Sequence, residues 1–164
     1  MVSSLAKNAP CRPTKLKLNK TFQPCPLTEG DEAYPNGIFE FNITRLLTFI
    51  DAHPEDFPLE PVPVAGIPDY GSSRLDEAAV SSADLSRPVL LAEIAPGRHN
   101  LIDGHHRVAK ARRDGVPTVP ARRIACPGHV PFLTTTAAYE KYVEYWNSKV
   151  DETRSPIRER SLGR

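Results

Sequence analysis

The chain has 164 residues, of which 40% are hydrophobic and 25% are charged, as expected for one globular domain with its own core. Its net charge is +1, so the molecule is not a polycation and any attraction for anions has to be local. No apolar run reaches the roughly 20 residues that span a bilayer, and residues 1–20 lack the apolar core of a signal peptide. These features, with three cysteines that show no disulfide spacing, predict a cytoplasmic protein without a membrane partner.

The first third of the chain shows two regular elements after a proline-rich start. Residues 1–35 have no clear period, and we expect them to form an extended N-terminal arm across a domain that covers 36–150. A short alternating strand follows at 37–43. The apolar spacing of 43–50 then predicts a helix, with Asn42 as its N-cap.

The rest of the chain alternates strands and helices after one long loop. The segment 54–87 is rich in proline, serine and acidic residues, so we expect a loop there, with a short strand near 62–65. Three further strands are predicted, at 88–94, 100–102 and 118–124. A helix is expected over 104–114, a second amphipathic helix over 139–150, and a charged flexible tail over 151–164. The pattern predicts an α/β fold of the α+β mixed kind, with a small mixed sheet and about three helices.

The stretch DGHHR, residues 103–107, joins a predicted strand to a predicted basic helix. The first turn of a helix exposes unpaired N–H groups and the positive end of the helix dipole. Gly104 has no Cβ, so an anion can approach the backbone, and Arg107 can grip a phosphate with two parallel hydrogen bonds. We therefore predict a phosphate site formed by Gly104, His105, His106 and Arg107.

Several roles are open to the other side chains of this stretch. Asp103 can cap the helix, hold a histidine in one tautomer, or meet a magnesium ion bound to the phosphates. His105 or His106 is either a phosphate ligand or a general acid/base, since histidine titrates at about pH 6.5. The competing interpretation is an ordinary glycine-containing turn whose histidines only bind neighbouring loops. Neither GxGxxG nor GxxxxGK[ST] occurs, so neither a dinucleotide fold nor a P-loop is supported.

The order of motifs from 87 to 124 is a strand, a short turn, Leu101-x-x-Gly104-x-x-Arg107 at a helix start, then GVPTVP and another strand. In this order the segment resembles the core of the ParB/sulfiredoxin-like superfamily. The resemblance implies that fold, and it implies a nucleotide (ATP, ADP or CTP) whose phosphates are held by the turn from Gly104 to Arg107. It extends less clearly to the strand and helix at 37–52.

The branches of that superfamily imply different activities. Sulfiredoxins have a catalytic cysteine directly after the glycine, where this chain has His105, so sulfinic-acid reduction is not expected. Partition proteins add a helix-turn-helix domain, for which few residues follow here. The branch that phosphorylates a small molecule needs an acidic base, and Glu40 is the candidate. We therefore predict a protein that hydrolyses nucleotide or transfers its phosphate to a small acceptor, with Asp103, His105, His106 and Glu40 as catalytic candidates.

Binding without catalysis is the alternative function. Lys110, Arg112 and Arg113 belong to a basic cluster that could contact nucleic acid. No aromatic residues interleave with these cations for base stacking, so a solvated helix face that supports the nucleotide site is the favoured interpretation. A protein partner on the same surface and a nucleotide sensor without turnover also stay open.

Overall fold

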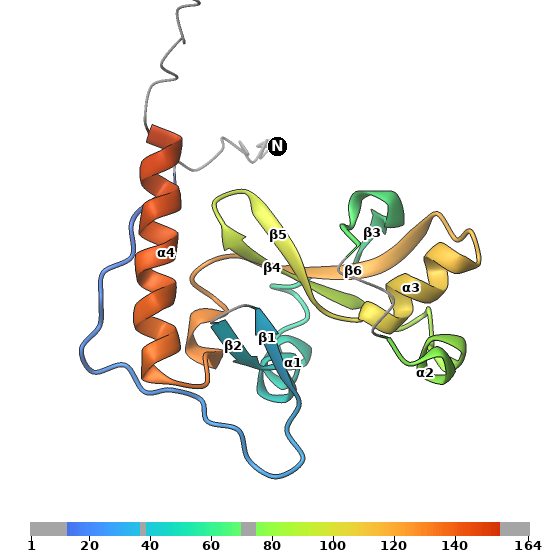
Figure 1. The fold of residues 1–164 in the computed structure, drawn as a ribbon, viewed down its shortest axis with the longest axis horizontal. Helices are drawn as coiled ribbons and strands as arrows, with labels where there is room; N and C mark the ends of the chain where they lie inside the picture. Colours follow the sequence, from blue (N-terminus) through green and yellow to red (C-terminus); the bar gives the residue numbers. More distant parts are fainter. Residues whose placement is uncertain (1–12, 37–38, 70–74, 155–164) are drawn as a thin grey trace, which may run out of the picture.

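A four-stranded mixed sheet lies at the centre of the fold, with helices on both faces (Figure 1). This computed structural model describes residues 13–36, 39–69 and 75–154. The strands are β1 (Ala33–Asn36), β2 (Phe39–Asn42), β3 (Glu60–Pro63), β4 (Val89–Ala95), β5 (Arg98–Asp103) and β6 (Thr118–Ile124). The helices are α1 (Ile43–Ala52), α2 (Glu77–Ser82), α3 (His105–Arg113) and α4 (Thr136–Arg154), with short 3-10 turns η1 (Val64–Gly66) and η3 (Val130–Phe132). None of the helices in the described ranges is long and apolar enough to cross a membrane.

Strand β4 is the centre of the sheet, whose order is β3-β6-β4-β5. It pairs antiparallel with β5 and parallel with β6, and β1 and β2 form a separate two-stranded sheet. All residues of β4 except Glu93 are buried, because both faces of the strand are covered. Helix α3 follows the β4–β5 hairpin and returns the chain so that β6 lies beside β4. The predicted mixed sheet and the helix between its last two strands are confirmed.

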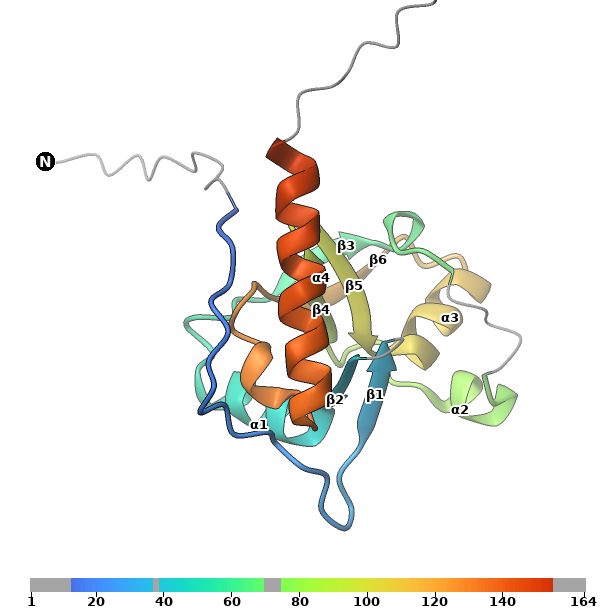
Figure 2. The ribbon, with the colours of Figure 1, turned by 60° about the vertical axis from the view of Figure 1, so that its left-hand side comes forward.

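Each face of the sheet packs into its own hydrophobic core. One core gathers α1, α4 and β2 against side chains that include Leu90 and Ile102. The other places α3, β3 and η1 against Val89, Leu91 and Leu101. Figures 1 and 2 show the sheet between α4 on one side and α3 on the other. Neighbouring residues of β4 and β5 therefore face opposite cores, as the two-residue period of a strand requires.

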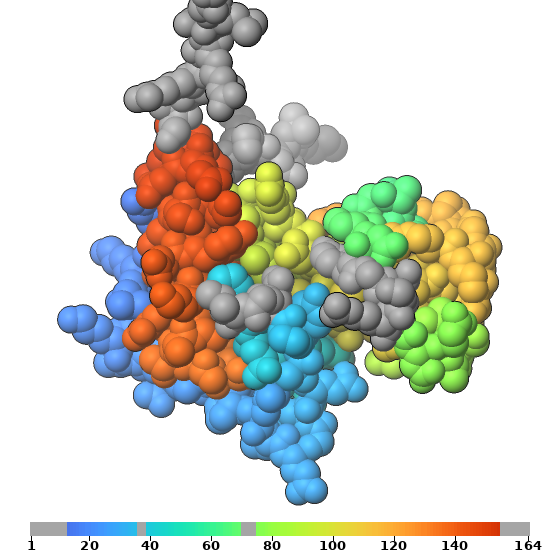
Figure 3. Space-filling model, viewed as in Figure 1, coloured from blue at the N-terminus to red at the C-terminus, as the bar shows by residue number. Residues whose placement is uncertain are grey.

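The first residues of the described arm lie against α4, where blue atoms border the orange and red helix (Figure 3). The side-chain amide of Asn147 binds both backbone groups of Leu16 in the arm, as a residue of a neighbouring strand would. Its Oδ1 accepts from the N–H of Leu16 at 2.7 Å, and its Nδ2 donates to the Leu16 carbonyl oxygen at 3.0 Å. Trp146 is buried, and its Nε1 donates to the carbonyl oxygen of Thr14 at 2.9 Å. The arm is thus anchored by the last helix of the chain.

The structure shifts some expected boundaries. Residues 33–35 of the expected arm belong to β1, and residues 151–154 of the expected tail form the end of α4. The expected loop 54–87 contains β3, η1 and α2, so the described ranges hold four α-helices where about three were expected. Helix α2 is too short to show a helical period, and Asp76 caps it by accepting from the N–H of Ala78 at 3.1 Å. The parts of these predictions that fall on 1–12, 37–38, 70–74 and 155–164 lie outside the described residues.

Candidate functional site

Strand β5 ends at Asp103 and α3 begins at His105, so Gly104 makes the turn between them. Its φ angle of +102° is in the region that favours glycine. A Cβ at this position would lie 2.6 Å from Cγ1 of Val89 on β4. The glycine is therefore required by the turn and by its packing on the sheet. A Cβ at Gly104 would face β4. The lack of a side chain therefore does not open the backbone to an anion on that side, and the expectation drawn from the sequence is wrong on this point.

The guanidinium group of Arg107 closes the turn from the inside. Its Nη1 donates to the carbonyl oxygen of Pro88 at 2.7 Å, and its Nη2 donates to Oδ2 of Asp103 at 2.9 Å. The Arg107 and Asp103 side chains are only 12% and 18% exposed, so this ion pair is shielded from water. Two residues predicted to bind phosphate and magnesium thus bind each other. In this structure Arg107 is a positioning residue for the turn.

The first turn of α3 keeps the backbone features of an anion site. Its N-cap is Gly104, which has no side-chain oxygen to accept from the first N–H groups. Asp103 does not act as the cap. No acidic residue lies in the first turn, so the helix itself does not neutralise the positive end of its dipole. The first N–H groups of this nine-residue helix therefore have no side-chain cap.

Two cavities of about 380 Å³ and 360 Å³ meet at this turn. Four residues line both of them: Glu32, Asp103, Gly104 and His106. The first, called here the aromatic cavity, adds mainly apolar and aromatic side chains: Tyr34, Ile43, Leu75, Ile102 and His105. The second, called here the polar cavity, adds a largely charged and hydroxylic lining that includes Ser82, Asp84, Arg87 and Arg107. The structure therefore brings the whole predicted stretch 103–107 to the walls of these cavities.

His105 lies against Tyr34 of β1 in the aromatic cavity. The two rings are stacked with centroids 5.1 Å apart, and Nε2 of His105 is 3.5 Å from the Tyr34 hydroxyl oxygen. Burial lowers the pKa of His105 below the ordinary histidine value; the Asp103 carboxylate opposes this shift and His106 adds to it. At neutral pH His105 is therefore an uncharged imidazole, which can accept a proton.

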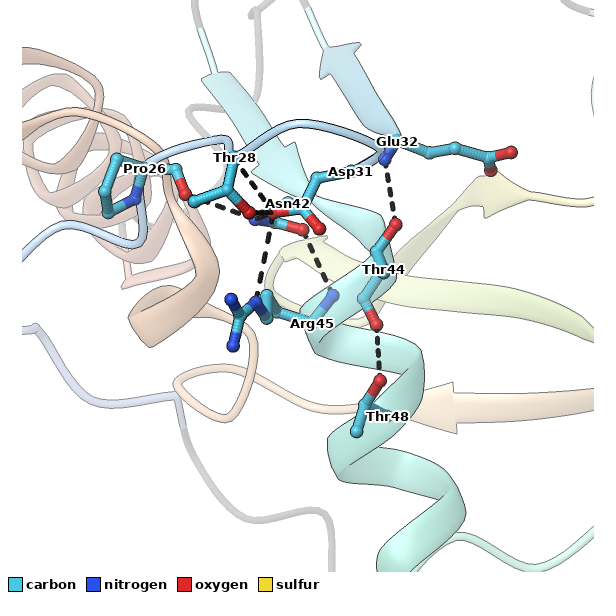
Figure 4. Close-up of polar contacts among 8 residues, drawn as sticks. All are labelled: Pro26, Thr28, Asp31, Glu32, Asn42, Thr44, Arg45 and Thr48. Atoms are coloured by element: carbon cyan, nitrogen blue, oxygen red, sulfur yellow. Dashed lines mark hydrogen bonds and ion pairs between the residues drawn. The ribbon is translucent and has the colours of Figure 1, made fainter.

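Besides Asp103, the structure places a second acidic residue at both cavities: Glu32, which the sequence did not indicate. The N-cap Asn42 accepts from the N–H of Arg45 at 3.1 Å and donates to Oδ2 of Asp31 at 2.8 Å, which ties the arm to the start of α1. The N–H of Glu32 then donates to Oγ1 of Thr44 at 2.8 Å. Figure 4 shows the Glu32 side chain extending away from this network. Glu32 lies in a stretch without periodicity, so only this tertiary network identifies it.

Glu40, the predicted acidic base, lies elsewhere. Its Oε1 accepts from Oγ1 of Thr134 at 2.8 Å, and its carbonyl oxygen accepts from the N–H of Thr134 at 3.0 Å. It lines neither the aromatic nor the polar cavity. Glu40 therefore connects β2 to the segment before α4. Glu32, and not Glu40, lies at the two cavities.

The basic residues of α3 bind the segment that precedes β4. Nζ of Lys110 donates to the carbonyl oxygen of Ala83 at 3.0 Å, and Nη2 of Arg112 donates to that of Ile67 at 2.7 Å. Nη1 of Arg113 donates to Oγ of Ser81 in α2 at 3.0 Å. These three cations, the candidates for nucleic-acid contacts, thus hold η1 and α2 against α3, which agrees with the favoured interpretation of a supporting helix face.

The described residues do not form a ready-made magnesium site. Among the residues that the structure describes, no group of three or more His, Cys, Asp or Glu side chains is arranged to hold a metal. Asp103 lines both cavities, but its Oδ2 already accepts from Arg107. Magnesium often enters such sites with the phosphates and takes only one or two carboxylates from the protein. No step proposed below depends on it.

No protein-family model, curated protein or solved structure matches the chain. The site itself combines backbone donors at a helix start, a neutral histidine, and carboxylates between an aromatic and a polar cavity.

Proposed function

We propose that the chain binds a nucleotide across the two cavities and hydrolyses it or transfers one of its phosphates to a small acceptor. The observation that carries the proposal is the meeting of both cavities at the uncapped start of α3. Helix starts favour phosphate because their N–H groups and dipole both point at the anion. Each cavity is within the roughly 300–1,000 Å³ range of small-molecule sites.

The linings suggest how the ligand is oriented. Tyr34, Leu75 and His105 offer an aromatic and apolar wall suited to a flat base. Arg87 offers hydrogen-bond donors in the polar cavity, where a phosphate acceptor would lie. The phosphates would then cross the turn at Gly104, between the two.

Proton transfer would fall to groups that line both cavities or the aromatic one. Glu32 and His106 line both, and the lowered pKa of His105 leaves it neutral and able to accept a proton at neutral pH. The order of strand, turn and helix is the feature on which the resemblance to the ParB/sulfiredoxin-like superfamily rests, and we retain that resemblance as part of this proposal. Arg107 and Asp103 would hold the turn in the shape that the phosphates need.

A thermal-shift titration with ATP, ADP and CTP, each with and without magnesium, tests the proposal. At 100 times its dissociation constant a ligand stabilises the folded state by about 2.7 kcal/mol, which for a domain of this size raises the midpoint by roughly 5–10 °C. We expect this shift in the wild type, and we expect His106→Gln to reduce it. His53→Gln is the matched control, because His53 lies exposed at the end of α1.

A phosphate-release assay on the nucleotide that binds then separates catalysis from binding. Product formed by the wild type and lost in Glu32→Gln would support hydrolysis or transfer. A shift without product would leave a binding protein without turnover. The absence of a shift with every nucleotide would refute the proposal.

A further inference from the structure

A third, smaller cavity lies behind the Arg107–Asp103 ion pair. It measures about 120 Å³ and lies between α1, the start of β4 and the middle of β6. Three arginines and two aspartates line it: Arg87, Arg107, Arg122, Asp51 and Asp103. Since Arg87, Arg107 and Asp103 also line the polar cavity, the two spaces are neighbours that share a wall.

Strand register determines the face of the sheet on which Arg122 lies. Leu90 on β4 is the register partner of both Arg122 on β6 and Asp103 on β5, so the three residues form one row across the sheet. Ile124, two positions after Arg122 and so on the same face, is part of the core beneath α1 and α4. Arg122 therefore lies at the edge of an apolar core, next to the charged residues that line the cavity.

The guanidinium group of Arg122 is incompletely satisfied. Its Nε and Nη1 are buried and have no hydrogen-bond partner within the part of the chain that the structure describes. The nearest carboxylate oxygen, Oδ1 of Asp51, is 3.8 Å from Nη1 and belongs to a side chain that is 73% exposed. A long contact to an exposed carboxylate does not compensate for buried donors of a charged group.

We propose that this three-arginine cavity binds a small tetrahedral oxyanion with the chemistry of phosphate. Three guanidinium groups face two carboxylates there, and one of those carboxylates is already paired with Arg107, so the lining has an excess of positive charge. Guanidinium groups match the oxygen spacing of phosphate, and a buried oxyanion would satisfy the Arg122 donors. The volume is several times the roughly 10–15 Å³ that one water needs, and it is below the roughly 300 Å³ of nucleoside-sized sites.

The ligand is therefore a free phosphate ion or the end phosphate of a larger molecule. The cavity is separate from the backbone donors of α3, so the inference does not require that the chain bind a nucleotide.

The test compares two neighbouring arginines of β6 in a thermal-shift titration with sodium phosphate, against sodium chloride at equal ionic strength. Arg122→Met removes the buried charge. Arg123→Met is the matched control, because Arg123 is the next residue on the opposite face of the strand and pairs with the exposed Glu60. We expect phosphate to raise the unfolding midpoint of the wild type and of Arg123→Met. The apparent affinity for phosphate should fall about tenfold or more in Arg122→Met, as the loss of a charged hydrogen bond implies.

In phosphate-free buffer, Arg122→Met should unfold at a midpoint no lower than that of Arg123→Met, because the variant removes unsatisfied buried donors. An equal rise in the wild type and Arg122→Met would show a general salt effect and overturn the proposal, as would no rise in the wild type. If Arg122→Met does not fold, Arg87→Met at the exposed rim decides the matter, and an unchanged phosphate response in that variant overturns the proposal.

A parallel titration with ATP separates the two possible sources of the oxyanion and the two proposals. An ATP response that Arg122→Met preserves, beside a lost phosphate response, assigns the cavity to free phosphate. An ATP response that weakens together with the phosphate response assigns it to the end phosphate of the nucleotide. A response to ATP but not to phosphate would refute this inference alone, and a response to phosphate but to no nucleotide would refute only the proposed function.

Discussion

Arg107 and Asp103 form a largely buried ion pair across the turn that starts α3, with Nη2 of the arginine 2.9 Å from Oδ2 of the aspartate. Because Arg107 also donates to the carbonyl oxygen of Pro88, one guanidinium group connects the end of β5 to the residue before β4. The pair lies where the polar cavity and the three-arginine cavity share a wall. We expect this ion pair to make the turn at the proposed phosphate site rigid.

Replacement of Arg107 should therefore reduce stability as well as ligand binding. We expect Arg107→Met to lower the free energy of unfolding by roughly 1.5–3 kcal/mol, because it leaves the shielded Asp103 carboxylate and the Pro88 carbonyl without their donor. The double variant Asp103→Asn, Arg107→Met should be less destabilised than the sum of the single variants. Urea denaturation of all four proteins measures this coupling, and strictly additive losses would contradict the pairing.

Gly104 should tolerate no side chain. Gly104→Ala places a Cβ at 2.6 Å from Cγ1 of Val89 and at a φ of +102°, so the expected loss is roughly 2–4 kcal/mol of unfolding free energy. Gly66→Ala is the control, since a Cβ there meets no atom within 4 Å and the φ angle is not in the left-handed region. Equal stability of the two variants would show that the turn relaxes freely.

His129 should make the protein less stable in acid. It is fully buried, its Nε2 donates to the Glu93 carbonyl oxygen at 2.6 Å, and burial lowers its pKa to about 4, although the bond to Glu93 opposes the shift. The unfolded chain takes up a proton at about pH 6.5 and the folded chain only near pH 4, so stability falls as pH falls through this interval.

The expected contribution is roughly 3 kcal/mol between neutral pH and pH 4. His129→Gln keeps a donor for Glu93 but cannot titrate. As the pH falls, the unfolding free energy of the wild type should therefore decrease relative to that of the variant. Parallel stability curves for the two proteins between pH 7 and pH 4 would rule out His129 as the cause.

Arg112 should contribute to folding by fastening η1. Arg112→Met removes the donor to the Ile67 carbonyl oxygen at 2.7 Å, and we expect a loss of roughly 1.5–3 kcal/mol. Arg113→Met serves for comparison, because Arg113 binds only side chains, and its loss should be within about 1 kcal/mol. If both variants keep wild-type stability, the cations of α3 are free for other contacts, and salt-dependent nucleic-acid binding should be measured next.

Asn147 should control the release of the arm. Asn147→Ala deletes both hydrogen bonds to the backbone of Leu16, with an expected loss of roughly 1–3 kcal/mol, and trypsin should then cut faster at Lys17 and Lys20. Ser148→Ala is the neighbouring control, because that hydroxyl binds only the carbonyl oxygen of Tyr145 within α4. Unchanged cleavage rates in Asn147→Ala would mean that Trp146 and other contacts suffice to hold the arm.

Local patterns determined much of the fold. The spacing of Ile43, Leu46 and Ile50 indicates α1, and Asn42 is its N-cap as predicted, because a helix start is satisfied by a neighbour in sequence. The apolar run of β4 and the Pro-Gly turn after it indicate the β4–β5 hairpin, because a hairpin too is formed by residues close together in sequence. By contrast β1 was missed, because Ala33–Asn36 lies in a stretch without a clear period.

The sequence by itself determined that one helix start would be surrounded by Asp103, Gly104, His105, His106 and Arg107. These residues are consecutive, and a single glycine separates the end of the strand from the first residue of the helix. Only the tertiary structure decided that Arg107 binds Asp103, that Glu32 and not Glu40 lines the aromatic and polar cavities, and that Arg122 and this ion pair line one smaller cavity. Those relationships depend on strand register and on the packing of the arm against α1. Both arise from contacts between segments far apart in the chain, and no local periodicity specifies such contacts.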